Sequence, residues 1–136
     1  MGTSDFTNPY NETNADAAKR LYTSATQKYD LKDYAEAVRL YEQAWQKDPY
    51  AGTFHYLALC YYHGWGTAKN AMRCHDLTFH AARMNDAQSM YNLASFYSSG
   101  FGCEANPKNA RYWPEQAANQ GYIPARYTPA AHQHPE

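Results

Sequence analysis

The chain has 136 residues, enough for about one domain, and its 12 basic and 13 acidic side chains leave a formal net charge of −1. This balance argues against a nucleic-acid-binding surface, and no apolar run approaches the roughly 20 residues that span a bilayer. One valine and one isoleucine, against 22 alanines and 14 tyrosines, argue against a β-sheet protein and favour closely packed helices.

The first predicted unit covers residues 14–50 and contains two helices. Asn14 to Tyr29 is predicted as the first helix, and Asp33-Tyr34-Ala35-Glu36 resembles a capping box that opens the second. Pro49 follows the last turn of that second helix, a common stop. The buried stripe of the second helix is predicted to be Ala37, Leu40, Tyr41, Ala44 and Trp45.

The second predicted unit covers residues 51–86 and consists of a helix, a Gly-x-Gly turn and a second helix. The first helix has one apolar face, and Gly64 lies just past that face, where a left-handed terminating residue is wanted. The residues of the apolar face are Tyr56, Leu57, Cys60 and Tyr61.

The third predicted unit, residues 87–122, repeats the second at an offset of 36 residues. Asn106 and Pro107 supply an N-cap residue and a proline at the first position of the last helix, and Gly121 closes it. Pro114 removes a hydrogen bond to the carbonyl of Ala110 and is expected to bend or break this helix, so we expect a kink. The alanine pairs 81–82 and 117–118 are predicted to let neighbouring backbones pack closely.

These units carry the pattern Leu-Ala-x-x-Tyr-x-x-Gly-x-Gly, then Asn, then an aromatic pair, then Ala-Ala. The second unit has Leu57-Ala58, Tyr61, Gly64-Trp65-Gly66, Asn70, Leu77-Thr78 and Ala81-Ala82. The third has Leu93-Ala94, Tyr97, Gly100-Phe101-Gly102, Asn106, Trp113 and Ala117-Ala118. Both resemble Sel1-like repeats, apart from Leu77-Thr78 in place of the aromatic pair and Pro114 in place of its second member. The first unit is similar to a tetratricopeptide repeat, with Ala25, Ala37, Tyr41, Ala44 and Pro49 at that spacing.

The resemblance implies an all-α fold, a tetratricopeptide/Sel1-like α-solenoid of three helical hairpins and about six helices. Residues 1–136 then form one domain with a polar tail over 123–136. A solenoid normally ends in a polar capping helix, and none is predicted after Gly121. We therefore expect either that Ile123 to His134 folds back as a cap or that another protein covers this end.

In such repeats the first helix of each hairpin lines the concave surface, which here is rich in tyrosines and hydroxyl groups. Tyrosines suit a protein or peptide partner, because they combine a large stiff contact area with a hydrogen-bonding tip. The alternative is that they simply pack within the solenoid. The predicted partner-binding residues are Tyr22, Tyr29, His55, Leu59, Tyr62, His63 and Tyr91 on the concave face, and Trp113 and Tyr122 at the C-terminal end. Lys19, Thr26, Gln88, Ser95 and Ser98 are predicted on the same concave face.

No metal site, cofactor or catalytic centre is predicted. His55, His63, His75 and His80 lack the stereotyped spacing of zinc ligands, and the Gly-x-Gly turns lack the remaining residues of a phosphate loop. Cys60 and Cys74 align with core positions, so we expect them to be buried. Three cysteines do not suggest a secreted disulfide framework, and residues 1–20 contain no signal segment.

The sequence therefore predicts a non-catalytic, intracellular protein-interaction module, with cytoplasm and mitochondrion not distinguished. Its expected role is a small scaffold or accessory subunit of a hetero-oligomeric assembly, with no nucleic-acid partner and no membrane span. A free-standing adaptor or immunity-type inhibitor is the alternative, and a small-molecule hydrolase is a third reading.

Overall fold

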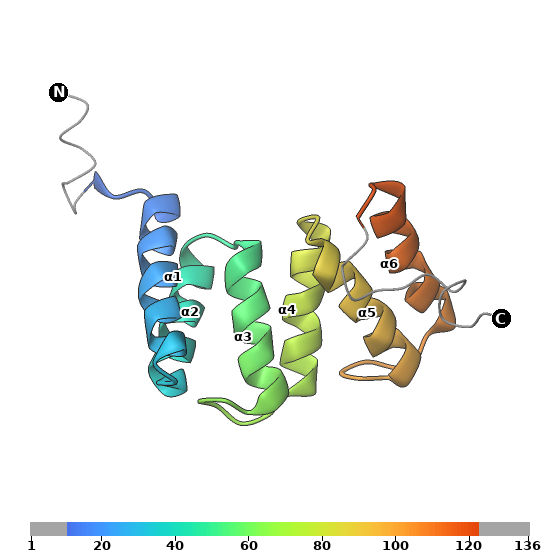
Figure 1. Cartoon of the computed structure of the whole chain (residues 1–136), viewed down its shortest axis with the longest axis horizontal. Coiled ribbons are helices and arrows are strands. Elements are labelled where there is room, and N and C mark those ends of the chain that lie inside the picture. The colour runs from blue at the N-terminus through green and yellow to red at the C-terminus, as the bar shows by residue number, and fades with distance from the viewer. Residues whose placement is uncertain (1–10, 123–136) are drawn as a thin grey trace.

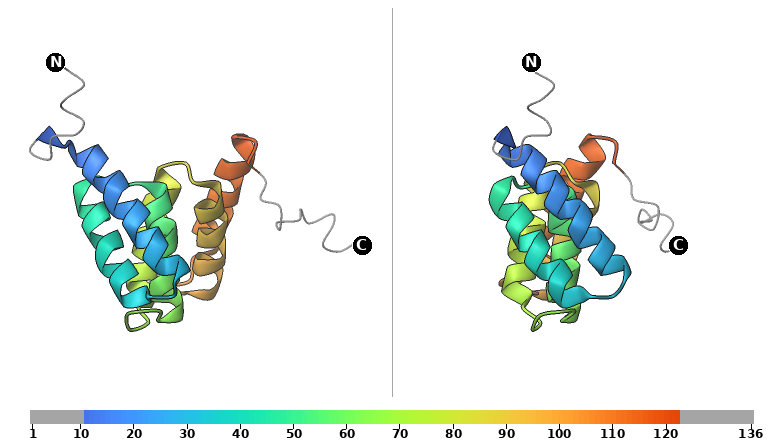
Figure 2. Two further views of the ribbon diagram at one scale, coloured as in Figure 1. Left: turned by 60° about the vertical axis from the view of Figure 1, so that its left-hand side comes forward. Right: turned by 90° about the vertical axis from the view of Figure 1, so that its left-hand side faces the viewer.

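The computed structural model describes residues 11–122, and this part of the chain forms helices and turns without a strand. The six helices are α1 (Asn14–Asp30), α2 (Tyr34–Lys47), α3 (Ala51–His63), α4 (Ala71–Arg83), α5 (Ala87–Ser99) and α6 (Pro107–Asn119). They pair as the hairpins α1–α2, α3–α4 and α5–α6, which follow one another in a row (Figure 1). Figure 2 shows successive hairpins tilted against one another along this row. The predicted α-solenoid of three helical hairpins is confirmed.

The predicted ends of the helices in the two Gly-x-Gly units are confirmed in detail. Gly64 and Gly100 end α3 and α5 in the left-handed conformation, at φ 77° and 78°. Asn70 and Asn106 cap α4 and α6 with the same backbone geometry, φ −149° and ψ 97°. The two units are therefore repeats in conformation as well as in sequence.

The predicted capping box at the start of α2 is wrong, although the helix does begin at Tyr34. Asp33 has φ −87° and ψ 73° and makes no side-chain capping hydrogen bond. It therefore lacks the extended backbone that usually brings an N-cap oxygen to the free amides of the first turn. The Glu36 carboxylate binds the Arg39 guanidinium instead of the Asp33 amide.

The last helix is not broken at Pro114, since α6 continues to Asn119. Pro114 removes only one amide donor, and the turns on either side remain helical. The expected kink at this position stays a prediction. The predicted fold-back of Ile123 to His134 lies outside the described residues.

The second glycine of each Gly-x-Gly turn touches the backbone of the preceding hairpin. A Cβ on Gly66 would lie 2.3 Å from the carbonyl carbon of Tyr34, at the start of α2. A Cβ on Gly102 would lie 2.3 Å from the carbonyl oxygen of Ala71, at the start of α4. Both glycines also have positive φ, 74° and 72°. Because only glycine allows this approach, these two contacts set how closely consecutive hairpins stack.

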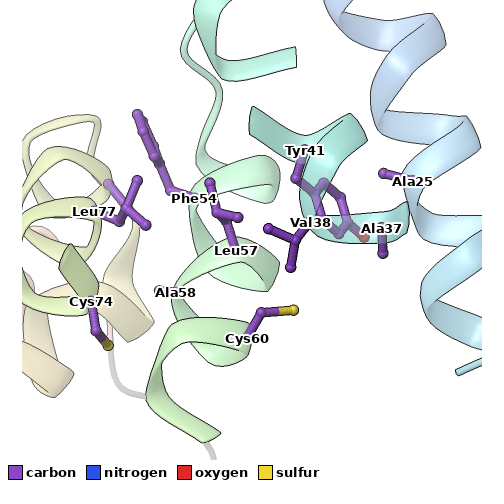
Figure 3. Close-up of a cluster of buried hydrophobic side chains, with 11 residues drawn as sticks. Ala25, Ala37, Val38, Tyr41, Phe54, Leu57, Ala58, Cys60, Cys74 and Leu77 are labelled. Atoms are coloured by element: carbon purple, nitrogen blue, oxygen red, sulfur yellow. The ribbon is translucent and has the colours of Figure 1, made fainter. Parts of the chain in front are cut away.

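The core consists of two clusters of buried apolar side chains. In the first cluster, Val38 of α2 points toward Leu57 and Cys60 of α3 (Figure 3). The second cluster joins α4, α5 and α6 and contains Ala82, Met90, Tyr91, Leu93 and Ala117. Most of the predicted stripe of α2 is confirmed: Ala37, Tyr41 and Ala44 are buried, while Leu40 and Trp45 are partly buried.

The prediction for the second alanine pair is half wrong. Ala81, Ala82 and Ala117 are buried, but Ala118 is exposed. Ala82 packs in the cluster formed with the following hairpin, and within the described residues no hairpin follows α6 to cover Ala118.

A polar cluster joins the first two hairpins. An Arg73 nitrogen in α4 lies 2.8 Å from a Glu42 oxygen in α2, and the Arg73 guanidinium sits 4.4 Å from the centre of the Trp45 ring. The Tyr61 hydroxyl of α3 donates to the same carboxylate at 2.7 Å. The cluster is partly shielded from solvent, so its charge-assisted bonds are less screened than those of an exposed pair.

The buried cysteines are confirmed as core residues. Cys60 and Cys74 are 0% and 2% exposed, and burial raises the pKa of each thiol to about 11. The third thiol, Cys103, is partly exposed, and its S–H donates to the Phe96 carbonyl. At neutral pH all three groups are therefore thiols rather than thiolates.

We predict that replacing Gly102 with alanine strongly destabilises the protein. The left-handed conformation costs an L-residue about 1–2 kcal/mol, and the clash with Ala71 adds about 1–3 kcal/mol. Gly121→Ala is the matched control, because Gly121 also has positive φ (80°) but has nothing within 4 Å of the added Cβ. Urea unfolding followed by circular dichroism measures both. Equal losses of unfolding free energy in the two variants would contradict the role assigned to the close contact.

We also predict that the three thiols differ in reactivity. With a chromogenic disulfide reagent at neutral pH, Cys103 should react first, while Cys60 and Cys74 should react only after denaturation, because the core excludes the reagent. The Cys103→Ser variant should lose the fast phase. A fast phase that includes all three thiols would show that the core opens readily.

Candidate protein-binding groove

A groove runs between α3 and α5, and α4 forms its floor. Its deepest part is a cavity of about 330 Å³, with four of the predicted concave-face residues in its wall. These four are His55, Leu59, Tyr62 and His63 of α3. The other lining residues are Phe54, Ala58, Cys74, Thr78, Ser89, Asn92, Ser95 and Phe96.

The groove continues beyond this cavity in both directions. Toward the start of α3 it passes His55 and Leu59 and reaches Gly52, Asp86 and Gln88. Toward the end of α5 it passes Tyr62, Ser95 and Phe96 and reaches Ser98, Ser99 and Phe101. Since α3 and α5 each have 13 residues, the groove is about 20 Å long, which is enough for a short extended peptide.

The polar side chains of the groove are held in place by hydrogen bonds along α5. The Ser89 hydroxyl and amide both donate to the Asp86 carboxylate, which caps the helix. The Gln88 amide nitrogen donates to the Asn92 amide oxygen at 3.1 Å. In the floor, the Thr78 hydroxyl donates to the Cys74 carbonyl at 2.8 Å. The lining therefore offers positioned amides and hydroxyls, with Asp86 as its carboxylate.

Aromatic rings form the rim at the other end. Tyr62 is 46% exposed, and its ring centre lies 5.0 Å from that of His63 and 5.2 Å from that of Phe101. His63 in turn stacks on Trp65 at 4.2 Å. These contacts restrict the ring of Tyr62 while leaving nearly half of it accessible to a partner.

Tyr22 and Tyr29 do not lie in this groove. Both are in α1, and their rings contact Tyr41 and Tyr56 instead. Burial raises the pKa of both hydroxyl groups. The contacts of Tyr22 and Tyr29 with Tyr41 and Tyr56 therefore fit the alternative, in which these tyrosines pack within the solenoid. A role of either residue in partner binding stays a prediction.

The remaining predicted residues belong to the C-terminal hairpin. Tyr91 is only 9% exposed, although it borders the groove, and its hydroxyl donates to the Tyr122 carbonyl at 2.6 Å. Trp113 is half-buried and meets Phe79 edge to face. Trp113 and Tyr122 both pack against the second core cluster. Their predicted contact with a partner is not tested by this arrangement.

Sequence reasoning missed Thr78, Ser89, Asn92 and Phe96 as groove residues. Periodicity identifies which face of α3 is exposed, but Thr78 comes from the second helix of its hairpin, and in the sequence it stands out only as a departure from an aromatic pair. A signal for Thr78 and Asn92 is nevertheless present in the sequence. At the equivalent positions one hairpin earlier the chain has the larger residues Tyr41 and Tyr56. Within the described chain, no three His, Cys, Asp or Glu side chains gather closely enough to hold a metal ion.

Two solved structures are similar to this chain. One is the c5321 protein, described as a protective antigen present in uropathogenic Escherichia coli strains and displaying an SLR fold. Its sequence is 22% identical to this chain, the match covers 76% of this chain and 23% of that chain, and the TM-score is 0.70. The other is a Sel1 repeat protein from Oxalobacter formigenes, with 26% identity, 65% and 66% covered, and a TM-score of 0.60. This chain thus corresponds to about a quarter of the first protein and just under two thirds of the second. No curated protein sequence matches it.

The family model of the Sel1 repeat matches residues 28–48, 55–86 and 87–122. The first match lies in the hairpin whose sequence is similar to a tetratricopeptide repeat, and the other two end where the predicted units end. Sel1 repeat proteins generally mediate protein–protein interactions, and their fold is typically non-catalytic. None of the helices within residues 11–122 is long and apolar enough to cross a membrane. The chain belongs to the Sel1 repeat family.

Proposed function

We propose that this protein is a small accessory subunit that binds a segment of another protein in the groove between α3 and α5. The observation that carries the proposal is the cavity of about 330 Å³ in which His55, Leu59, Tyr62 and His63 line one wall. The helical periodicity of the sequence independently predicts these four residues on the concave face. A preformed concave site that combines apolar walls with a few positioned polar groups is typical of binding sites.

The chemistry of the lining favours an uncharged, partly apolar peptide. Partly exposed apolar residues such as Leu59 and Phe96 provide area to bury, while Asn92 and Ser95 can bond to peptide groups. Asp86 is the one acidic group in the lining, at the end of the groove near Gly52. Few charges mean that affinity rests on burial and hydrogen bonds rather than on long-range attraction.

The outer side of α6 is a second proposed contact. Ala118 occupies the position at which Ala82 is covered by the next hairpin, and it is exposed. In the assembly proposed here, a partner subunit covers this side and reaches Trp113 and Tyr122 at its edge.

We predict that Tyr62→Ala weakens partner capture at least about tenfold, because exposed, well-positioned tyrosines often dominate interface energies. Leu31→Ala is the control, because Leu31 is 74% exposed at the end of α1 and lies outside the groove lining and the proposed contact on α6. Tyr112→Ala tests the second proposed contact, because Tyr112 is 47% exposed on α6 and meets Trp113 edge to face at 5.0 Å. The measurement is quantitative mass spectrometry of proteins captured from native lysate by each variant, with helicity checked by circular dichroism. Loss of the same partners with Tyr112→Ala alone would place the contact at the C-terminal end.

We predict further that the main partner is captured in a fixed ratio and that this ratio survives a rise in salt. A groove with few charges should be insensitive to ionic screening. Native mass spectrometry of the endogenously purified protein measures the ratio. Elution as a lone monomer that binds only on demand would favour the alternative role of a free-standing adaptor or inhibitor.

A further inference from the structure

We infer that the cavity between α3, α4 and α5 receives an aromatic side chain of the bound polypeptide. This inference deepens the proposed function and rests on it, since it names what the partner inserts. Two equivalent places in the same molecule differ, since one is filled by the chain's own rings and the other is hollow.

The ends of the helices define which positions are equivalent. The C-caps Leu31, Gly64 and Gly100 align α1, α3 and α5, and the N-caps Asp33 and Asn70 align α2 with α4. The close glycine contacts agree independently, because Gly66 meets Tyr34 and Gly102 meets Ala71, the first residues of α2 and α4. In this alignment Tyr41 of α2 corresponds to Thr78 of α4, and Tyr56 of α3 corresponds to Asn92 of α5.

Between the first two hairpins, the space at these positions is filled by rings. Tyr41 and Tyr56 stack with their centres 5.7 Å apart and their planes 2° apart. Tyr22 and Tyr29 of α1 contact the same pair, and the Thr26 hydroxyl lies 2.9 Å from the Tyr41 hydroxyl. The scaffold therefore accommodates stacked phenol rings at this site and supplies a hydrogen bond to one hydroxyl.

Between the second and third hairpins, both rings are replaced by small polar residues. Thr78 and Asn92 stand where Tyr41 and Tyr56 would be, and both line the cavity of about 330 Å³. The wall formed by α3 matches the equivalent face of α1 in the spacing of its residues. In this alignment His55, Leu59 and Tyr62 of α3 correspond to Tyr22, Thr26 and Tyr29 of α1. The cavity thus lies between the positions that two tyrosines occupy one hairpin earlier.

The walls of the cavity suit a ring better than an aliphatic chain. Phe96 offers partly exposed aromatic surface, Tyr62 and His63 add two further rings to the lining, and the small side chain of Ala58 leaves space between them. The Asn92 amide and Ser95 hydroxyl provide partners for a phenol hydroxyl. A volume of this size is at the lower end of small-molecule sites, about 300–1,000 Å³, and so matches one or two side chains rather than a larger ligand.

The test uses the full chain, labelled with ¹⁵N, and two probes: N-acetyl-tyrosinamide and N-acetyl-leucinamide. We expect the tyrosine probe to shift the amide signals of Thr78 and Asn92 and to bind about fivefold more tightly than the leucine probe. Equal binding of the two probes, or shifts confined to residues outside the cavity, would overturn the inference.

A graft of the chain's own residues provides the decisive variant. The double substitution Thr78→Tyr/Asn92→Tyr recreates the filled site and should abolish binding of the tyrosine probe while helicity is retained. Asp76→Tyr is the matched control, because Asp76 is an exposed residue of the same helix outside the lining, and it should bind normally. If the double variant fails to fold, Asn92→Tyr alone replaces it, with the same expected loss.

The outcomes separate this inference from the proposed function. If Tyr62→Ala loses the protein partner while the capped tyrosine and leucine bind equally, the groove binds protein without an aromatic preference and only the inference fails. Persistence of tyrosine-probe binding in the folded graft variant would also overturn it.

Discussion

The stacking of this solenoid depends on two contacts of backbone against backbone. The second glycine of each turn lies against the first turn of the preceding hairpin's second helix, Gly66 on Tyr34 and Gly102 on Ala71. A side chain at either glycine would push the hairpins apart, so these contacts fix the spacing between units. With that spacing fixed, the sizes of the side chains between two hairpins decide whether the space is filled or open.

The same spacing produces two different interiors. Tyr41 and Tyr56 fill the first interval with stacked rings, so it contributes to the core. Thr78 and Asn92 leave the second interval hollow and partly polar. One interval is therefore part of the core and the next is the proposed binding surface, although their backbones follow the same plan. The difference between the two intervals lies in the size of the side chains at equivalent positions.

Much of the fold followed from local signals, because helix ends depend on a few neighbouring residues. Gly64 and Gly100 end their helices and Asn106 caps the start of α6, as the sequence predicts. A left-handed C-cap and an N-cap need only local backbone geometry. Asp33 shows the limit of this reasoning: the residue type suits a cap, but its backbone conformation does not present the side chain to the helix.

The site was less predictable, because periodicity gives the face of a helix and not what packs against that face. His55 and Tyr62 proved to line an open groove, whereas Tyr22 on the corresponding face of α1 contacts other tyrosines. Tyr91 was expected on the concave face but is largely buried, because its hydroxyl reaches the Tyr122 carbonyl after the chain turns at the end of α6. These outcomes depend on pairs of residues far apart in the sequence.

The cluster of Arg73, Glu42 and Trp45 makes the two junctions between hairpins chemically different. Its directional bonds join α2 to α4, whereas the equivalent positions one hairpin later are Asn109, Phe79 and Ala82, which cannot form a charged pair. The second and third hairpins are instead held by apolar packing and by the contact of Gly102 with Ala71. Because salt screens charged bonds and leaves apolar burial in place, ionic strength acts on the first junction and spares the second.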